Sequence, residues 1–163
     1  ISKNYGMPGW RVGMVAAPEA IINKLLTLSS TSITNINNVS MAAAAAAFGG
    51  DQGFSDAVID AFAKKRDMVM AALADIPNLT CPLPKGAFYA FPDVSAYYGK
   101  THNGQEITDD VALCTRMLEE KNLALVPGSA FGEPNGVRIS YACPEDQLKE
   151  GLKRFAAFFA ECE

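Results

Sequence analysis

Residues 2–13 read Ser-Lys-Asn-Tyr-Gly-Met-Pro-Gly-Trp-Arg-Val-Gly, and they carry more information than any other stretch of the chain. They place Lys3 and Arg11 eight positions apart (11 − 3), with Ser2 beside the lysine. A deprotonated lysine amine attacks carbonyl carbons, and a guanidinium matches the geometry of a phosphate group. A reactive amine and a phosphate-binding guanidinium are among the parts needed to hold an aldehyde cofactor. Taken alone, Lys3 is more typical of a surface lysine, and Arg11 of a structural arginine beside Trp10.

A second arginine, Arg138, lies far downstream between Val137 and Ile139. The β-branched neighbours predict a strand. A charge in such a strand is usually exposed at an edge or paired, so a structural ion pair is the first explanation. A guanidinium also binds a carboxylate through two parallel hydrogen bonds, which makes a carboxylate site the alternative.

Composition limits the class of protein. The chain has 163 residues, 49% of them hydrophobic, which suffices for one ordinary domain or for two unequal pieces of a larger one. A net charge of −4 argues against nucleic acid or an anionic membrane as the main partner. The longest apolar run, 41–48, is too short to span a membrane. Because Ile1 is not an initiator methionine and no signal peptide follows it, we expect an internal fragment or a processed chain.

Cysteine and histidine usage argues against a metal site. The four cysteines form no CxxC pair, and their scatter fits free thiols in a reducing compartment such as the cytoplasm. The single histidine, His102, lies in turn-like sequence and is expected at the surface. One histidine excludes a multi-histidine metal site within this chain, so we expect no metal.

Apolar spacing and turn residues predict a chain of mixed helices and strands. The expected helices cover 18–28, 39–48, 56–75, 110–121 and a last helix opening at Pro144, and the expected strands cover 11–17, 86–91, 123–126 and 137–141. Stretches 29–38 and 97–106 are predicted as loops. Because alanines allow close approach, helix 39–48 is expected to be buried, whereas Lys64-Lys65-Arg66 is expected on an exposed helix face. Residues 79–163 thus predict a small α+β domain, 51–78 a bridging helix, and 1–50 the remnant of a larger domain.

The stretch 2–13 resembles the cofactor-lysine motif of class I/II aminotransferases, fold-type I enzymes that use pyridoxal 5'-phosphate. Residues 127–132 (Pro-Gly-Ser-Ala-Phe-Gly) and 137–142 are similar to the C-terminal signature of that family, and 86–89 to the first strand of its small domain. The resemblance covers essentially the whole chain. It implies an α/β fold class, namely the C-terminal part of a PLP-dependent transferase fold: the end of the large domain (1–50) plus the small α+β domain.

The resemblance also implies a role for each residue of the motifs. Lys3 would be the catalytic lysine that holds the cofactor covalently, Arg11 would bind its phosphate with Ser2 adding a hydroxyl, and Arg138 would bind the substrate α-carboxylate. The implied function is transfer of an amino group between an amino acid and a 2-oxo acid in a homodimer. Loop 29–38 aligns with a region that approaches the partner subunit's active site in the family.

Within the family, 9–13 and 138–142 look most like bacterial-type aspartate aminotransferases, so aspartate is one candidate substrate. Pro8 departs from the threonine expected there, which leaves specificity open. Family members also contact the cofactor through an aspartate, a stacking aromatic, a tyrosine and an asparagine that precede the lysine. We therefore expect the chain alone to be inactive. Two alternatives stay open: a PLP-dependent lyase or regulatory domain of the same fold, and a non-catalytic binding or dimerisation fragment.

Overall fold

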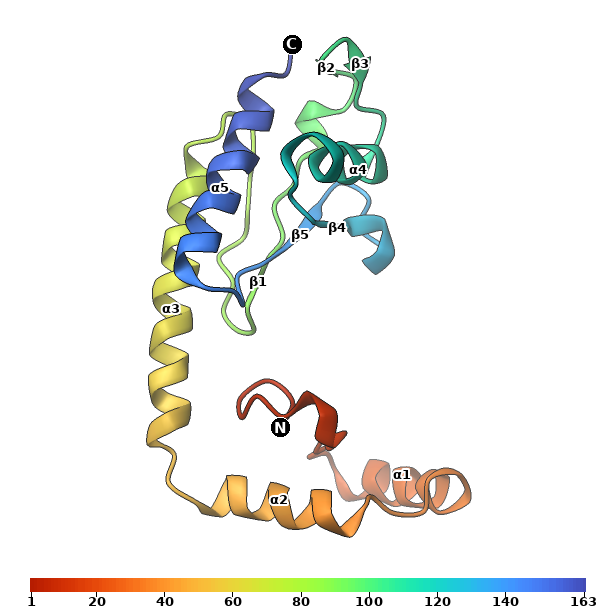
Figure 1. Ribbon diagram of the computed structural model, residues 1–163. Helices are drawn as coiled ribbons and strands as arrows, with labels where there is room; N and C mark the ends of the chain where they lie inside the picture. The colour runs from red at the N-terminus through yellow and green to blue at the C-terminus, as the bar shows by residue number, and fades with distance from the viewer. The chain divides into compact units, whose positions relative to one another are not determined.

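The computed structural model describes residues 1–163 and divides them into two compact units, Ile1–Asp60 and Ala61–Glu163. Figure 1 shows the helices and strands of both units with their labels. The first unit holds η1 (Pro8–Trp10), α1 (Glu19–Ser32), α2 (Asn38–Gly49) and the start of α3 (Gly53–Ala74).

The strand predicted over 11–17 is absent. Residues 11–18 have irregular backbone, and the first unit contains no strand with which they could pair. Val12 is buried, but Met14 and Val15 are 73% and 67% exposed. An extended segment becomes a strand only through hydrogen bonds to a neighbouring strand, so a β-type pattern without a partner stays irregular.

Helix α1 begins after Pro18 as predicted but runs to Ser32, so the first part of the expected loop 29–38 is helical. The hydroxyls of this part donate to carbonyls one turn back, as Ser32 Oγ does to Leu28 O at 2.8 Å. Such bonds let serine and threonine sit inside a helix, although their composition suggested a loop.

Helix α2 covers the alanine-rich stretch as predicted, and Asn37 caps it by accepting hydrogen bonds from the backbone amides of Val39 and Ser40. The prediction that it is buried is wrong for this chain, because Ala44 is its one buried residue. Val39 is 67% exposed, and Phe48 remains 45% exposed although the Tyr5 ring packs against it.

Helix α3 starts at Gly53, earlier than the expected start at residue 56, and Ser55 lies inside it. Asp51 Oδ1 accepts from the Gly53 amide at 3.1 Å and takes the capping role. Lys65 was expected on an exposed helix face. The structure places it half-buried, and its Nζ donates to Cys143 O at 2.6 Å.

The second unit contains a three-stranded antiparallel sheet in the order β1-β5-β4 and a separate two-stranded hairpin, β2-β3. Its elements after α3 are β1 (Tyr89–Ala90), η2 (Ser95–Tyr97), β2 (Thr101–His102), β3 (Gln105–Glu106), α4 (Asp110–Lys121), β4 (Val126–Pro127), η3 (Gly128–Phe131), β5 (Val137–Ser140) and α5 (Glu145–Ala160). Helices α4 and α5 and strand β5 agree with the predictions. The other two predicted strands are shorter, 86–91 shrinking to β1 and 123–126 shifting to β4.

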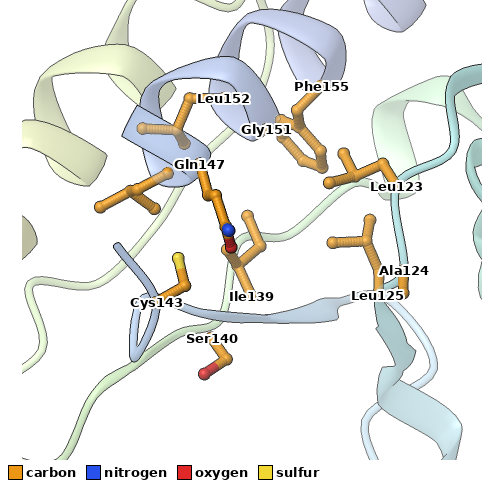
Figure 2. Close-up of a pocket in the computed structure, with 11 residues that line it drawn as sticks. Leu123, Ala124, Leu125, Ile139, Ser140, Cys143, Gln147, Gly151, Leu152 and Phe155 are labelled. Atoms are coloured by element: carbon orange, nitrogen blue, oxygen red, sulfur yellow. The ribbon is translucent and has the colours of Figure 1, made fainter. Parts of the chain in front are cut away.

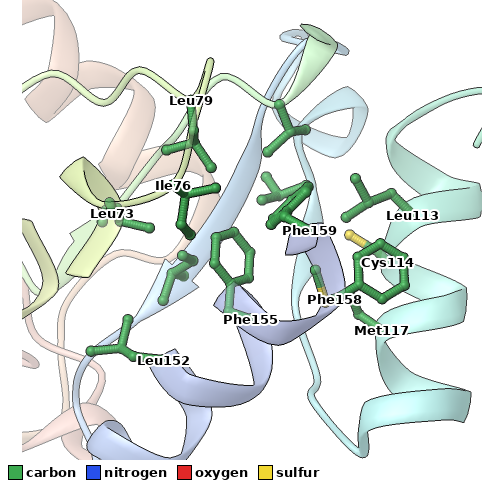
Figure 3. Close-up of a cluster of buried hydrophobic side chains, with 14 of the residues drawn as sticks. Leu73, Ile76, Leu79, Leu113, Cys114, Met117, Leu152, Phe155, Phe158 and Phe159 are labelled. Atoms are coloured by element: carbon green, nitrogen blue, oxygen red, sulfur yellow. The ribbon is translucent and has the colours of Figure 1, made fainter. Parts of the chain in front are cut away.

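The core of the second unit lies against α5. Five apolar residues at helical spacing along this helix are all buried: Leu148, Leu152, Phe155, Phe158 and Phe159. They pack with side chains from the end of α3 and from α4, including Leu73, Leu113 and Met117 (Figure 3). Burying a side chain of this size stabilises the fold by about 1.5–3 kcal/mol, so α5 holds the unit together.

His102 is fully buried, which corrects the expectation of a surface loop histidine. The polar stretch 97–106 folds into the β2-β3 hairpin around Asn103-Gly104, both with positive φ (49° and 73°), as asparagine–glycine turns do. The imidazole stacks on Phe158 with ring centroids 4.1 Å apart, and its Nε2 lies 3.0 Å from Glu161 Oε2. Burial is tolerated because polar neighbours satisfy the ring nitrogens.

Lowering the pH should weaken the interaction of His102 in the β2-β3 hairpin with Glu161, which follows α5. The hydrogen bond from Lys121, together with His102, lowers the pKa of Glu161 from its ordinary 4.5. A lowered carboxyl pKa contributes stability that is present above the ordinary value and lost as pH falls through the lowered one. We expect Glu161→Gln to lower the urea midpoint at neutral pH and to reduce its fall between about pH 6 and pH 3. Glu119→Gln, which removes an exposed charge without a salt bridge, is the control. Equal pH profiles for both variants would contradict the assignment.

Candidate functional site

The N-terminal motif forms a turn that is tied to the first unit. The Gly6 amide donates to Lys3 O at 3.3 Å, and the terminal amine donates to Val12 O at 3.4 Å. Tyr5 anchors the turn: its hydroxyl donates to Gln52 Oε1 at 2.7 Å, and its ring packs edge-on against Phe48 at 5.5 Å. Lys3 is exposed and Ser2 is half-buried on this turn. The backbone around the lysine is therefore ordered by local bonds and by one aromatic anchor.

Arg11 follows η1 with a left-handed backbone (φ 54°) and an exposed side chain. Its Nη1 donates to Pro8 O at 3.2 Å, and it forms no salt bridge. A guanidinium has five N–H groups, so most of its donors remain available to an anion. The side chain borders a hollow of about 850 Å³, whose walls include Trp10, Asn35 and Asn37. Sequence reasoning did not anticipate that the segment before α2 lies beside Arg11.

Arg138 lies on β5 between two aromatic rings. Val137 and Ile139 point into the core, so alternation along the strand directs Arg138 to the opposite face. Its Cζ lies 4.5 Å from the ring centroid of Tyr89 and 4.3 Å from that of Phe131. Both distances are within the range of cation–π attraction. Arg138 makes no salt bridge in this chain, so the structural ion pair suggested by the sequence alone is not formed.

The motif 127–132 places Phe131 over Arg138. The Gly128 amide donates to Gly136 O at 2.9 Å, and a Cβ at position 128 would overlap the carbonyls of Glu133 and Gly136. Gly132 ends the turn with φ 80°, a conformation that glycine adopts without strain. The motif is thus a tightly packed turn whose glycines serve the backbone. Sequence reasoning missed Phe131 and Tyr89 as neighbours of Arg138, since residues 86–91 were predicted only as a strand.

One partly open pocket of the second unit is lined neither by Arg138 nor by the motif 127–132. It has a volume of about 120 Å³ and lies between α5 and the segment before β4 (Figure 2). Its walls are mainly apolar, with Leu123, Leu152 and Phe155 among them, and neither Arg138 nor any charged side chain lines it. No group of three or more histidine, cysteine or acidic side chains is arranged to hold a metal. No helix combines the length and apolar character needed to cross a bilayer.

Comparison with known proteins decides the family. Residues 1–155 match the model of the family described as aminotransferase class I and II. The chain belongs to this family. An aspartate/prephenate aminotransferase of Cereibacter sphaeroides is 42% identical over 161 residues, which are 98% of this chain and 40% of that protein. An aspartate aminotransferase of Streptomyces avermitilis is 39% identical over 163 residues, 100% of this chain and 40% of that protein.

Solved structures of aminotransferases confirm the predicted fold class, an α/β part of the PLP-dependent transferase fold. The aspartate aminotransferase of Rhizobium meliloti superposes with a TM-score of 0.88 at 37% identity, covering 99% of this chain and 41% of that chain. The aspartate aminotransferase of Thermotoga maritima gives a TM-score of 0.81 at 34% identity, covering 98% of this chain and 38% of that chain. This member of the aminotransferase family thus spans about two fifths of the length of these relatives.

The tight packing of the motif 127–132 leads us to predict how a substitution at Gly128 changes the free energy of unfolding. We expect Gly128→Ala to lower the free energy of unfolding by about 1–3 kcal/mol, because the new methyl group would meet two backbone carbonyls. Gly86→Ala is the matched control, since a Cβ there meets nothing within 4 Å and no positive φ is involved. Urea denaturation followed by circular dichroism measures both. Equal stability of the two variants would contradict the proposed packing.

Proposed function

We propose that this chain supplies the reactive lysine and two anion-binding arginines of an aminotransferase that moves an amino group between an amino acid and a 2-oxo acid. The observation that carries the proposal is Arg138, a guanidinium clamped between Tyr89 and Phe131 without an acidic partner. The two rings hold the cation in place of an acidic side chain. The N–H groups of the guanidinium therefore remain available to the carboxylate of a ligand. Membership of the aminotransferase family supports the same assignment.

The donor groups of the first unit fit pyridoxal 5'-phosphate as the cofactor. Arg11 offers guanidinium N–H groups beside a hollow, which suits a phosphate dianion. Ser2 adds a hydroxyl next to Lys3, whose amine is of the kind that attaches to an aldehyde carbon. When bound, the cofactor supplies an electron-withdrawing ring that stabilises negative charge at the amino-acid Cα.

The residues of the chain would act in distinct ways. Lys3 Nζ would remove the proton from the amino-acid Cα as general base and return a proton as general acid. Arg11 would hold the phosphate and so prevent the cofactor from shifting during proton transfer. Arg138 would bind the α-carboxylate through two parallel hydrogen bonds and restrict rotation of the amino acid.

Aspartate is the substrate that the proposal favours, supported by relatives named aspartate or aspartate/prephenate aminotransferase. We further propose a homodimer, which the resemblance to the aminotransferase family implies. A cytoplasmic location is supported by four free cysteines. No feature of the structure favours a lyase or a regulatory domain over transamination.

Covalent labelling tests the assignment of Lys3. The chain is titrated with pyridoxal 5'-phosphate, reduced with borohydride and mapped by mass spectrometry. We expect saturable labelling centred on Lys3, weakened in Arg11→Ala because the phosphate loses its partner. Lys24→Ala, which removes an exposed lysine of α1, should leave the pattern unchanged. Labelling spread evenly over all lysines and unaffected by Arg11→Ala would count against the assignment.

Steady-state kinetics of the complete polypeptide test the assignment of Arg138. Arg138→Lys keeps the charge but loses the two-pronged donor geometry, so we expect kcat/KM for amino acid and 2-oxo acid to fall about 10- to 150-fold. Arg154→Lys on α5, where the arginine pairs with Glu150, is the control and should change kcat/KM little. A similarly small change of kcat/KM in both variants would contradict the assignment of Arg138 to the carboxylate site.

A further inference from the structure

Asp110 is a buried carboxylate that does not cap its own helix, α4. It is the first residue of α4 and is 2% exposed. Asp109, one residue earlier, already caps α4 by accepting from the Ala112 amide at 2.7 Å. Burial of a charged group is unfavourable unless it is hydrogen-bonded, so the position of Asp110 calls for another explanation.

The partner of Asp110 is the turn that carries Phe131. Its Oδ2 accepts a hydrogen bond from the Ser129 backbone amide at 2.6 Å. Ser129 lies in the first turn of η3, which is preceded by Pro127, and proline has no side-chain oxygen to cap that turn. Asp110 therefore provides, from α4, the cap that η3 lacks in its own sequence.

The same loop is held at its far end by a neutral group. Tyr98 Oη donates to Pro134 O at 2.6 Å. Burial, and secondarily the negative charge of Asp110, raise the pKa of the Tyr98 hydroxyl above its ordinary value and that of Cys114 to about 12. Both groups therefore stay neutral near pH 7, so the Tyr98 hydroxyl keeps its proton and its hydrogen bond to the loop.

A short series of contacts leads from this anchor to the candidate carboxylate site. Asp110 fixes Ser129, and η3 ends at Phe131, whose ring lies 4.3 Å from Arg138 Cζ. Phe91 supports the same ring edge-on at 6.2 Å. If η3 moved, Arg138 would lose one of its two aromatic faces and gain rotational freedom.

We propose that Asp110 is a positioning residue for carboxylate binding: by capping η3 it keeps Phe131 stacked on Arg138, so the guanidinium meets its ligand in a fixed orientation. The inference rests on the proposed function of Arg138. Asp110 itself touches no substrate. Because it preorganises a binding group, its loss should weaken binding of the amino acid more than it slows turnover.

Kinetics of the complete polypeptide provide the first test. Asp110→Ala should raise KM for the amino acid about tenfold, with kcat changed less than about threefold. Asp110→Asn keeps an acceptor oxygen for the Ser129 amide and should recover most of the loss. Asp109→Ala removes the cap of α4 and should lower thermal stability without this rise in KM. A KM unchanged in Asp110→Ala, or raised equally in Asp109→Ala, would overturn the proposal.

An NMR measurement on the 163-residue chain separates this inference from the proposed function. Ring currents of Tyr89 and Phe131 should shift the Arg138 Nε–H proton upfield in the unmodified chain. The shift should decrease in Asp110→Ala and persist in Asp109→Ala and Asp110→Asn. Loss of this pattern would refute the positioning role, whereas its presence in a complete polypeptide that does not transaminate would refute the proposed function alone.

Discussion

Strand β5 sends alternate side chains to opposite faces, and both the core and the candidate carboxylate site depend on that alternation. Val137 and Ile139 are buried, while Arg138 lies on the other face between Tyr89 and Phe131. β5 is the central strand of the sheet, so β1 and the turn after β4 each contribute one ring. A slip of one residue would bury the guanidinium and expose both aliphatic side chains, which strongly fixes the register.

The sequence predicts well those elements whose signals are local. The apolar spacing of α5, the capping residue Asp109 before α4 and the β-branched neighbours of Arg138 each indicate an element that the structure contains. Two of the errors concern partners distant in sequence. Residues 11–17 have a strand pattern but no strand to pair with, and His102 is buried by Arg116 of α4, Phe158 of α5 and Glu161 just after it. The asparagine–glycine pair at 103–104 was an overlooked local signal of that hairpin.

In the candidate site, too, local motifs identify the functional residues but not the neighbours that surround them. Lys3, Arg11 and Arg138 are identified by motif spacing, because their chemistry restricts the residue type. Their surroundings are not: Tyr89 and Phe131 reach Arg138 from separate segments, and the hollow beside Arg11 is lined by the segment that precedes α2. Gly128 also has a steric role that no spacing rule reveals, because the carbonyls it would meet belong to residues five and eight positions later (133 − 128 and 136 − 128).

The two parts of the proposed chemistry have different physical support. Arg138 is attached to a core that includes four large, almost fully buried residues of the second unit, Tyr141, Phe155, Phe158 and Leu73. In the first unit the buried hydrophobic residues are Val12 and Ala44, so the turn around Lys3 is held mainly by local hydrogen bonds and by Tyr5. Segments with few buried contacts open at lower free energy than packed ones. In the isolated chain the geometry around Lys3 and Arg11 is therefore the less stable part, while the orientation of Arg138 follows the global stability of the second unit.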